Sequence, residues 1–285
     1  MGTSTRNSGQ SGHNPLIPTW LEGDPIPATP GQVAANPQTV PDSTQLPTRP
    51  DSQPIPSEAD PNRFRGPRTS FTHFVSGGGR NGNSMRNGVS HYVSRSLGGS
   101  SNATKRLGSS RTSTARLYGI LHTLSEPGGF QQVAQLLSLD TLQGLRAKEF
   151  FIRLARFVCP DGGTEDEGIS RSAYYDVVAD NPEMMGKPIE NLTKDEIDSI
   201  NQRYMSKVVM QQIMNGIANN AIRFSESLDE IAHIEEKVEQ LIDQSVSDAC
   251  AEMKQENIEM TNERAKEITD SIYQRVFEIL EGVGD

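Results

Sequence analysis

The chain has 285 residues, of which 34% are hydrophobic and 6% aromatic, and its formal net charge is −10. Both fractions are low for a globular protein, so part of the chain is predicted to stay outside any hydrophobic core. Two cysteines give neither a disulfide framework nor a cysteine metal site, and no apolar run suits a signal peptide or a membrane span, so we predict a cytoplasmic protein without membrane association.

The charges divide the chain into three parts. Residues 1–60 carry six acids and two bases, residues 61–116 carry ten bases and no acid, and residues 117–285 carry 31 acids and 15 bases. A basic middle joined to acidic helices either pairs with them or faces an anionic partner. We predict four segments: a flexible N-terminus with a docking element (1–20), a proline-rich disordered tether (21–61), a basic Arg/Gly-rich segment with short helices (62–116) and an acidic α-helical domain (117–285).

The first twenty residues hold almost nothing that could build a core. With a glycine at position 2 the initiator methionine is normally removed, which leaves the α-amine of Gly2 as the terminus. A short apolar and aromatic patch follows, with the only tryptophan of the chain: Leu16, Ile17, Pro18 and Trp20. A flexible glycine end followed by such a patch is typical of a segment that another protein holds.

Residues 21–61 are predicted to form a tether. Thirteen of the seventeen prolines lie between Pro15 and Pro67, and proline fixes φ and removes a backbone donor, so neither a helix nor a strand ladder can form. About forty residues at roughly 3.1 Å each reach up to ~120 Å. A linker is favoured over a ligand for an SH3-like domain.

Residues 62–116 combine arginines with aromatic residues and glycines. Met85, Val89, Val93 and Leu97 recur every four residues and predict a short helix that ends at Gly98. A second helix is predicted from Asn102 to Leu124. The basic residues of this segment, candidates for contact with nucleic acid or a partner, are Arg63, Arg65, Arg68, Arg80, Arg86, Arg95, Lys105, Arg106, Arg111 and Arg116.

Two interpretations of the basic segment stay open. Arginines interleaved with aromatic residues can bind nucleic acid through phosphate contacts and base stacking. No RNA-recognition, zinc-finger or helix-turn-helix signature accompanies them. The interpretation favoured from sequence is a basic surface docked on the acidic helices or on a partner protein.

A conspicuous motif follows the helix predicted over residues 146–158. Pro160 ends that helix and a Gly-Gly pair turns the chain, after which Thr164 and Glu167 have the spacing of a capping box. Cys159 as a nucleophile, or the acids as metal ligands, are the alternatives, but no histidine flanks the cysteine. A structural role is therefore predicted for the motif residues Cys159, Pro160, Gly162, Gly163, Thr164, Asp166, Glu167 and Arg171, and no catalytic residue, metal site or cofactor is predicted.

The remainder is predicted to be helical. Thr193 with Glu196, and Ser227 with Glu230, have capping-box spacing. Apolar stripes over residues 231–241 and 268–279 predict a long C-terminal helical segment, either one continuous rod or a kinked helix or a pair of helices, with coiled-coil pairing as an alternative. The predicted fold is mainly α, a multi-helix body behind a disordered Gly/Ser- and Pro-rich tail.

Taken together, these stretches resemble the QatB family, a component of the bacterial Qat (QatABCD) anti-phage defence system. The resemblance is carried by the opening MGTST with NPLIPTW at 14–20, by the Arg- and Gly-rich residues 71–116, and by the run CPDGGTEDEGISR at 159–171. In that run Gly168 and Ser170 stand where the family pattern has alanine. The C-terminal half is similar only as a helical body of the expected kind.

The resemblance implies a non-catalytic subunit. Its implied partners are a QueC-like homologue of 7-cyano-7-deazaguanine synthase (QatC), a P-loop ATPase (QatA) and a TatD-like nuclease (QatD). Relatives of the synthase in defence operons join a deazaguanine to an N-terminal glycine, which makes Gly2 the implied modification site and the patch at Leu16 to Trp20 the implied docking element. The alternative is a nucleic-acid-binding subunit that recruits phage DNA or RNA to the nuclease.

Overall fold

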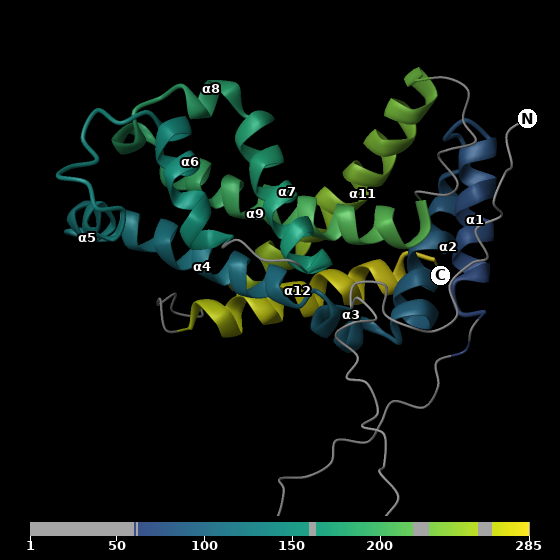
Figure 1. The fold of residues 1–285 in the computed structure, drawn as a ribbon. Coiled ribbons are helices and arrows are strands. Elements are labelled where there is room, and N and C mark those ends of the chain that lie inside the picture. Colours follow the sequence, from purple (N-terminus) through teal and green to yellow (C-terminus); the bar gives the residue numbers. More distant parts are fainter. Residues whose placement is uncertain (1–59, 61, 160–163, 219–227, 256–263, 285) are drawn as a thin grey trace, which may run out of the picture. The chain divides into compact units, whose positions relative to one another are not determined.

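The computed structural model describes residues 60, 62–159, 164–218, 228–255 and 264–284. In these residues the chain forms helices and no strands, which confirms the predicted mainly α fold (Figure 1). All of them belong to one compact unit, Pro56–Asp285. The tail predicted to be disordered lies outside the described residues.

The described elements succeed one another along the chain as a series of helices with short connections. They are α1 (Arg65–Ser76), α2 (Gly82–His91), the π-helix η1 (Tyr92–Leu97), α3 (Ser100–Arg106), α4 (Ser109–Ser125), α5 (Gly129–Leu136), α6 (Ala147–Val158), α7 (Glu165–Ala179), α8 (Pro182–Met185), the 3₁₀-helix η2 (Ile189–Asn191), α9 (Lys194–Ile213), the π-helix η3 (Met214–Ala218), α11 (Leu228–Gln255) and α12 (Ala265–Gly282).

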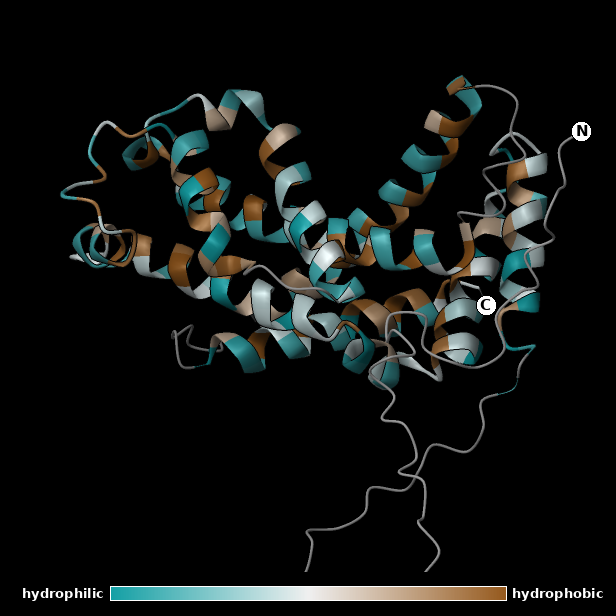
Figure 2. Ribbon diagram, viewed as in Figure 1, coloured by the Kyte–Doolittle hydropathy of each residue, from teal (hydrophilic) through white to brown (hydrophobic). Residues whose placement is uncertain are grey.

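Two helices, α9 and α12, organise the packing. α12 contacts α2, α3, α4 and α11, whereas α9 contacts α4, α7 and α11. The Tyr273 side chain of α12 is fully buried, and its hydroxyl lies 2.7 Å from Thr114 Oγ1 in α4, so this polar group is satisfied inside the core. Hydrophobic residues gather on the sides of the helices that face one another (Figure 2). The buried side chains of α12 include Ile268, Ile272, Tyr273, Val276, Phe277 and Leu280.

The first two helices form a hairpin closed by three glycines. Gly78 and Gly79 have φ values of +61° and +74°, which residues with a Cβ rarely adopt. A Cβ on Gly79 would press on the ring of His233 in α11, so the turn lies against that helix. The apolar stripe predicted here is confirmed, because all of its members are buried: Met85, Val89, Val93 and Leu97.

The single helix predicted from Asn102 to Leu124 is wrong, because Gly108 divides it into α3 and α4. Gly108 has a φ of +48° and a ψ of −120°, and a Cβ there would collide with the carboxylate of Asp166 in α7. The residue at the break is therefore a glycine that a distant part of the sequence approaches closely. Leu136 lies in an apolar helical pattern over residues 130–139 that predicts burial, and this prediction is wrong, since the side chain is 42% exposed.

Helix starts in the acidic part follow the predicted capping boxes. Thr164 caps α7 together with Glu167, and Thr193 caps α9 together with Glu196. The third predicted box lies partly outside the described residues, at Ser227. The C-terminal stripes form two helices that pack on each other, α11 and α12, rather than one rod. Of the helices described, none combines the length and apolar character needed to cross a membrane.

Candidate functional site

Part of the predicted site lies outside the described residues. This holds for Gly2, for the patch Leu16, Ile17, Pro18 and Trp20, and for Pro160, Gly162 and Gly163 of the motif. The basic residues and the rest of the motif are described, and they occupy two neighbouring regions joined by α4.

Most of the predicted basic residues reach solvent. Arg63 and Arg111 are half-buried, and Arg111 Nη1 lies 3.2 Å from Asp270 Oδ1 in α12. Within the described residues this is the one ion pair that joins a base of residues 62–116 to an acid. The exposed bases are Arg65, Arg68, Arg80, Arg86, Arg95, Lys105, Arg106 and Arg116.

Arg68 is exposed and at the same time fixed in place. Its Nε and Nη2 donate to the carbonyl oxygen of Gly216 in η3, at 3.3 and 3.2 Å. Its guanidinium also lies 5.0 Å from the ring centre of Phe64, and the Arg63 guanidinium lies at the same distance from that ring. Such cation–π contacts and hydrogen bonds reduce the freedom of a long side chain, so α1 presents Arg68 in a defined position.

Tyr92 joins the basic helices to the end of α9. Its hydroxyl donates to the carbonyl oxygen of Gln212 at 3.2 Å, and a Cβ on Gly216 would overlap its ring. Burial raises the pKa of Tyr92 to about 12. The hydrogen bond to Gln212 and the charges of Arg106 and Arg68 lower this pKa, and the charge of Glu165 raises it further. Charged groups of α1, α3 and α7 therefore act on Tyr92.

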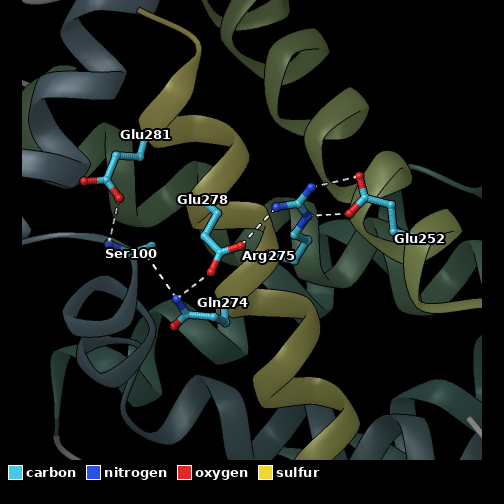
Figure 3. A network of polar contacts seen from close by, with 6 residues as sticks. All are labelled: Ser100, Glu252, Gln274, Arg275, Glu278 and Glu281. Atoms are coloured by element: carbon cyan, nitrogen blue, oxygen red, sulfur yellow. Dashed lines mark hydrogen bonds and ion pairs between the residues drawn. The ribbon is translucent and has the colours of Figure 1, made fainter. Parts of the chain in front are cut away.

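The C-terminal helix holds the basic helices to the acidic ones through a polar network (Figure 3). A carboxylate oxygen of Glu281 accepts the backbone N–H of Ser100 at 3.1 Å, and Gln274 Nε2 donates to Ser100 Oγ at 3.0 Å. Ser100 begins α3, so Glu281 satisfies a free N–H at the start of that helix. On the other side of α12, Arg275 Nη2 donates to Glu252 of α11 at 3.1 Å.

The motif cysteine sits in a buried cluster of hydroxyl groups. Cys159 Sγ lies 3.4 Å from Ser170 Oγ and 3.5 Å from Tyr204 Oη, and these two oxygens lie 2.6 Å apart. Burial raises the pKa of Tyr204 well above its ordinary value. None of these neighbours is a base that would remove the thiol proton, as nucleophilic catalysis requires.

The other motif residues shape the start of α7. Arg171 Nη2 donates to the carbonyl oxygen of Cys159 at 2.7 Å. The backbone N–H and the hydroxyl of Thr164 donate to Glu167, at 3.0 and 2.9 Å, and these hydrogen bonds lower the pKa of that carboxyl. Burial raises the pKa of Asp166, whose carbonyl oxygen accepts from Ser110 Oγ at 3.2 Å.

A small pocket of about 140 Å³ lies between the motif and α4. Its wall is formed mainly by hydroxyl groups, with one guanidinium and one carboxylate. In the part of the chain that is described, no three His, Cys, Asp or Glu side chains gather as metal ligands do. The pocket is lined by Ser109, Thr112, Ser113, Arg116, Cys159, Glu167 and Ser170.

Three residues of the site were missed from sequence, namely Tyr92, Gln212 and Gly216. Their contacts arise where two π-helices meet, and a π-turn has no simple periodic signal. The sequence feature that could have indicated these contacts was Gly216, because a glycine inside an apolar helical pattern can mark close packing.

A family model described as Qat anti-phage system associated protein QatB matches residues 98–280, well over half of the chain. The matched part begins after η1 and includes α3, α4 and the whole Cys159 motif. No curated protein and no solved structure matches the chain significantly.

Proposed function

The chain belongs to the QatB family of Qat anti-phage system associated proteins, and from this premise we propose that it acts as a non-catalytic adaptor and as the protein substrate of a partner enzyme. Membership implies a role in Qat anti-phage defence, with other components of that system as partners. The proposed enzyme is the QueC-like synthase homologue, and the proposed acceptor is the α-amine of Gly2. QatA and QatD are the further proposed partners.

The observation that supports this proposal is the fixed position of α1, the first described helix. Ser96 Oγ donates to the carbonyl oxygen of Arg63 at 2.8 Å, and Arg68 is bonded to Gly216. The chain before α1 therefore starts from a fixed point on the helical body. If residues 21–61 form the predicted tether, with a reach of up to ~120 Å, the N-terminus can enter an active site on a partner bound to the helical body.

The chemistry fits an N-terminal glycine. An α-amine has a pKa of about 7.7–8.0, so an appreciable fraction is neutral and nucleophilic near neutral pH, unlike a lysine amine. A carboxylate activated with ATP is attacked by this amine. A C–N bond forms, the activating group leaves and the amine gives up a proton. Glycine places no side chain beside the reacting nitrogen.

The test is the intact mass of the full chain after co-expression with the QueC-like partner. We expect a mass increase on the N-terminal peptide of the wild-type chain and of Gly2→Ala, which keeps a primary amine. Gly2→Pro replaces the primary amine with a hindered secondary amine and is expected to abolish the mass increase. The control Gly12→Pro makes the same substitution away from the terminus and is expected to keep the mass increase. An unmodified wild-type terminus, or modification that survives Gly2→Pro, contradicts the proposal.

The docking element is tested separately. If Leu16, Ile17, Pro18 and Trp20 hold the partner, Trp20→Ala is expected to reduce co-purification with the QueC-like protein, since buried aromatic anchors dominate many interfaces. The melting temperature of the variant is expected to match that of the wild type. Unchanged co-purification would exclude this patch as the anchor.

A further inference from the structure

Within the part of the chain that the structure describes, the exposed bases of α1 to α4 form no ion pairs with acids. Apart from Arg111, none of the ten bases of residues 62–116 forms an ion pair with a described residue. Several acids of α9, α11 and α12 are instead paired with bases of these same helices, such as Asp198 with Lys254 and Glu252 with Arg275. The positive charge of the basic segment is therefore directed to solvent.

From this arrangement we infer that the surface of α1 to α4 binds the phosphate backbone of a nucleic acid. The inference goes beyond the adaptor function and does not depend on the modification of Gly2. A protein surface with many bases and no acid attracts polyanions, and each phosphate it neutralises releases a counterion from the nucleic acid.

The absence of exposed apolar anchors on α1 to α4 favours nucleic acid over an acidic protein. In the described residues the large hydrophobic side chains that are largely exposed are Leu136, Ile152, Tyr175 and Leu228, which belong to α5, α6, α7 and α11. Phe64, just before α1, and Ile120 in α4 are partly buried. Protein interfaces depend on buried aromatic and aliphatic anchors, whereas surfaces that bind nucleic acid are polar and strongly positive.

The predominance of arginine over lysine among these bases also favours phosphate as the ligand. Of the ten bases, only Lys105 is not an arginine. The planar guanidinium matches phosphate oxygens with two parallel hydrogen bonds, which an ammonium group cannot do.

The centre of this surface is the region around Arg68. Its Nε and Nη2 are held by Gly216, so its remaining nitrogen is positioned in advance. Arg65 lies one helical turn away, and both residues border a pocket on α1 together with Thr69 and Thr72. The charge of Arg106 in α3 acts on Tyr92 in the same direction as that of Arg68, and the charge of Glu165 acts in the opposite direction.

The experiment is titration of the full chain with fluorescent oligo-dT, the corresponding duplex and poly-glutamate of equal charge, over a salt series from about 50 to 200 mM. The test variant is Arg65→Ala/Arg106→Ala, because neither side chain is hydrogen-bonded or ion-paired to a described residue, so folding is expected to be retained. The control is Arg146→Ala/Lys148→Ala, two exposed bases at the start of α6, with the same change of net charge.

We expect the wild type and the control to bind both nucleic acids with the same steep salt dependence. The test variant is expected to bind more weakly, with a log–log salt slope shallower by about 0.9 for each lost phosphate contact. Arg68→Ala is expected to weaken binding further. Equal weakening in the control, or no binding by the wild type, overturns the inference. Poly-glutamate binding as tight as that of oligo-dT would also overturn it and assign the surface to an acidic protein.

Discussion

In the acidic helices Lys207 lies between two carboxylates, 2.9 Å from Asp180 and 2.7 Å from Glu239, whereas Arg86 of α2 is exposed and pairs with no described acid. The same contrast separates Arg275, held by Glu252 and Glu278, from the exposed bases of α1 to α4. Solvent-exposed ion pairs contribute little stability, so the contrast matters mainly for recognition. Within the described residues, several bases of the acidic helices are paired with acids of those helices, whereas the bases of residues 62–116 other than Arg111 are not ion-paired.

The largest effect on stability is expected where the basic helices pack on the end of α9, at the contact between Tyr92 and Gly216. Gly216→Ala would place a methyl group within the ring of Tyr92, and overpacking of this kind costs about 3 kcal/mol. The free energy of unfolding, measured by denaturant titration, is expected to fall by this amount, because η3 can no longer pack as closely on Tyr92 of η1.

The matched control is Gly168→Ala in α7. A Cβ at this position meets nothing within 4 Å, and alanine is better than glycine inside a helix by about 1 kcal/mol. Gly168→Ala is therefore expected to stabilise the chain. Destabilisation by both substitutions to a similar extent would show that Gly216 has no special role at the contact with Tyr92.

The start of α7 offers a smaller effect within the acidic region. Thr164→Ala removes the hydroxyl that accepts from the backbone N–H of Glu167 at 3.3 Å, and loss of such a cap costs about 1 kcal/mol. Thr72→Ala on the exposed side of α1 is the control, with an expected change below about 0.5 kcal/mol. Thermal melts of the two variants would separate a cap effect from a general effect of losing a threonine.

The substitutions Lys207→Ala and Arg86→Ala compare a base that is ion-paired with a base that pairs with no described acid. Lys207 is partly buried and its loss leaves two acids without a partner, so a cost of up to about 1 kcal/mol is expected. Arg86→Ala is expected to leave stability unchanged and to affect only binding of polyanions. A stability loss from Arg86→Ala as large as that from Lys207→Ala would remove the distinction between the regions.

The smallest expected effect is a pH dependence from Glu196. Hydrogen bonds from Lys187 and from Thr193 lower the pKa of this carboxyl from its ordinary value of 4.5. The stabilisation is present above that value and is lost as the pH falls through the lowered pKa. In Glu196→Gln the melting temperature is expected to fall less with decreasing pH over this acidic range. A fall as steep as that of the wild type would show that Glu196 does not contribute to the pH dependence.

Local signals predicted the local features of this fold. The spacing of Thr164 and Glu167 predicted a capping box, and the four-residue recurrence from Met85 to Leu97 predicted a buried stripe. Both are confirmed, because helix caps and amphipathic faces depend on residues close in sequence.

Features set by distant contacts were not predictable. Gly108, at the break between α3 and α4, is closely approached by Asp166, and Leu136 reaches solvent because α5 is a short helix at the edge of the fold, although its hydrophobic pattern favours burial. The meeting of Tyr92 with Gly216 joins segments more than a hundred residues apart. Neither composition nor periodicity records which helices become neighbours.

The π-helices η1 and η3 have a consequence for insertions and deletions. A π-turn closes its hydrogen bonds one residue later than an α-turn, so each of these segments holds an additional residue relative to an uninterrupted α-helix. Deleting one residue from Met214–Ala218 would let α9 continue as a regular helix and rotate the residues after the deletion by about 100°. The Gly216 carbonyl would then turn away from Arg68. The fixed position of the Arg68 side chain thus depends on the number of residues in a π-helix that lies 148 residues further along the chain.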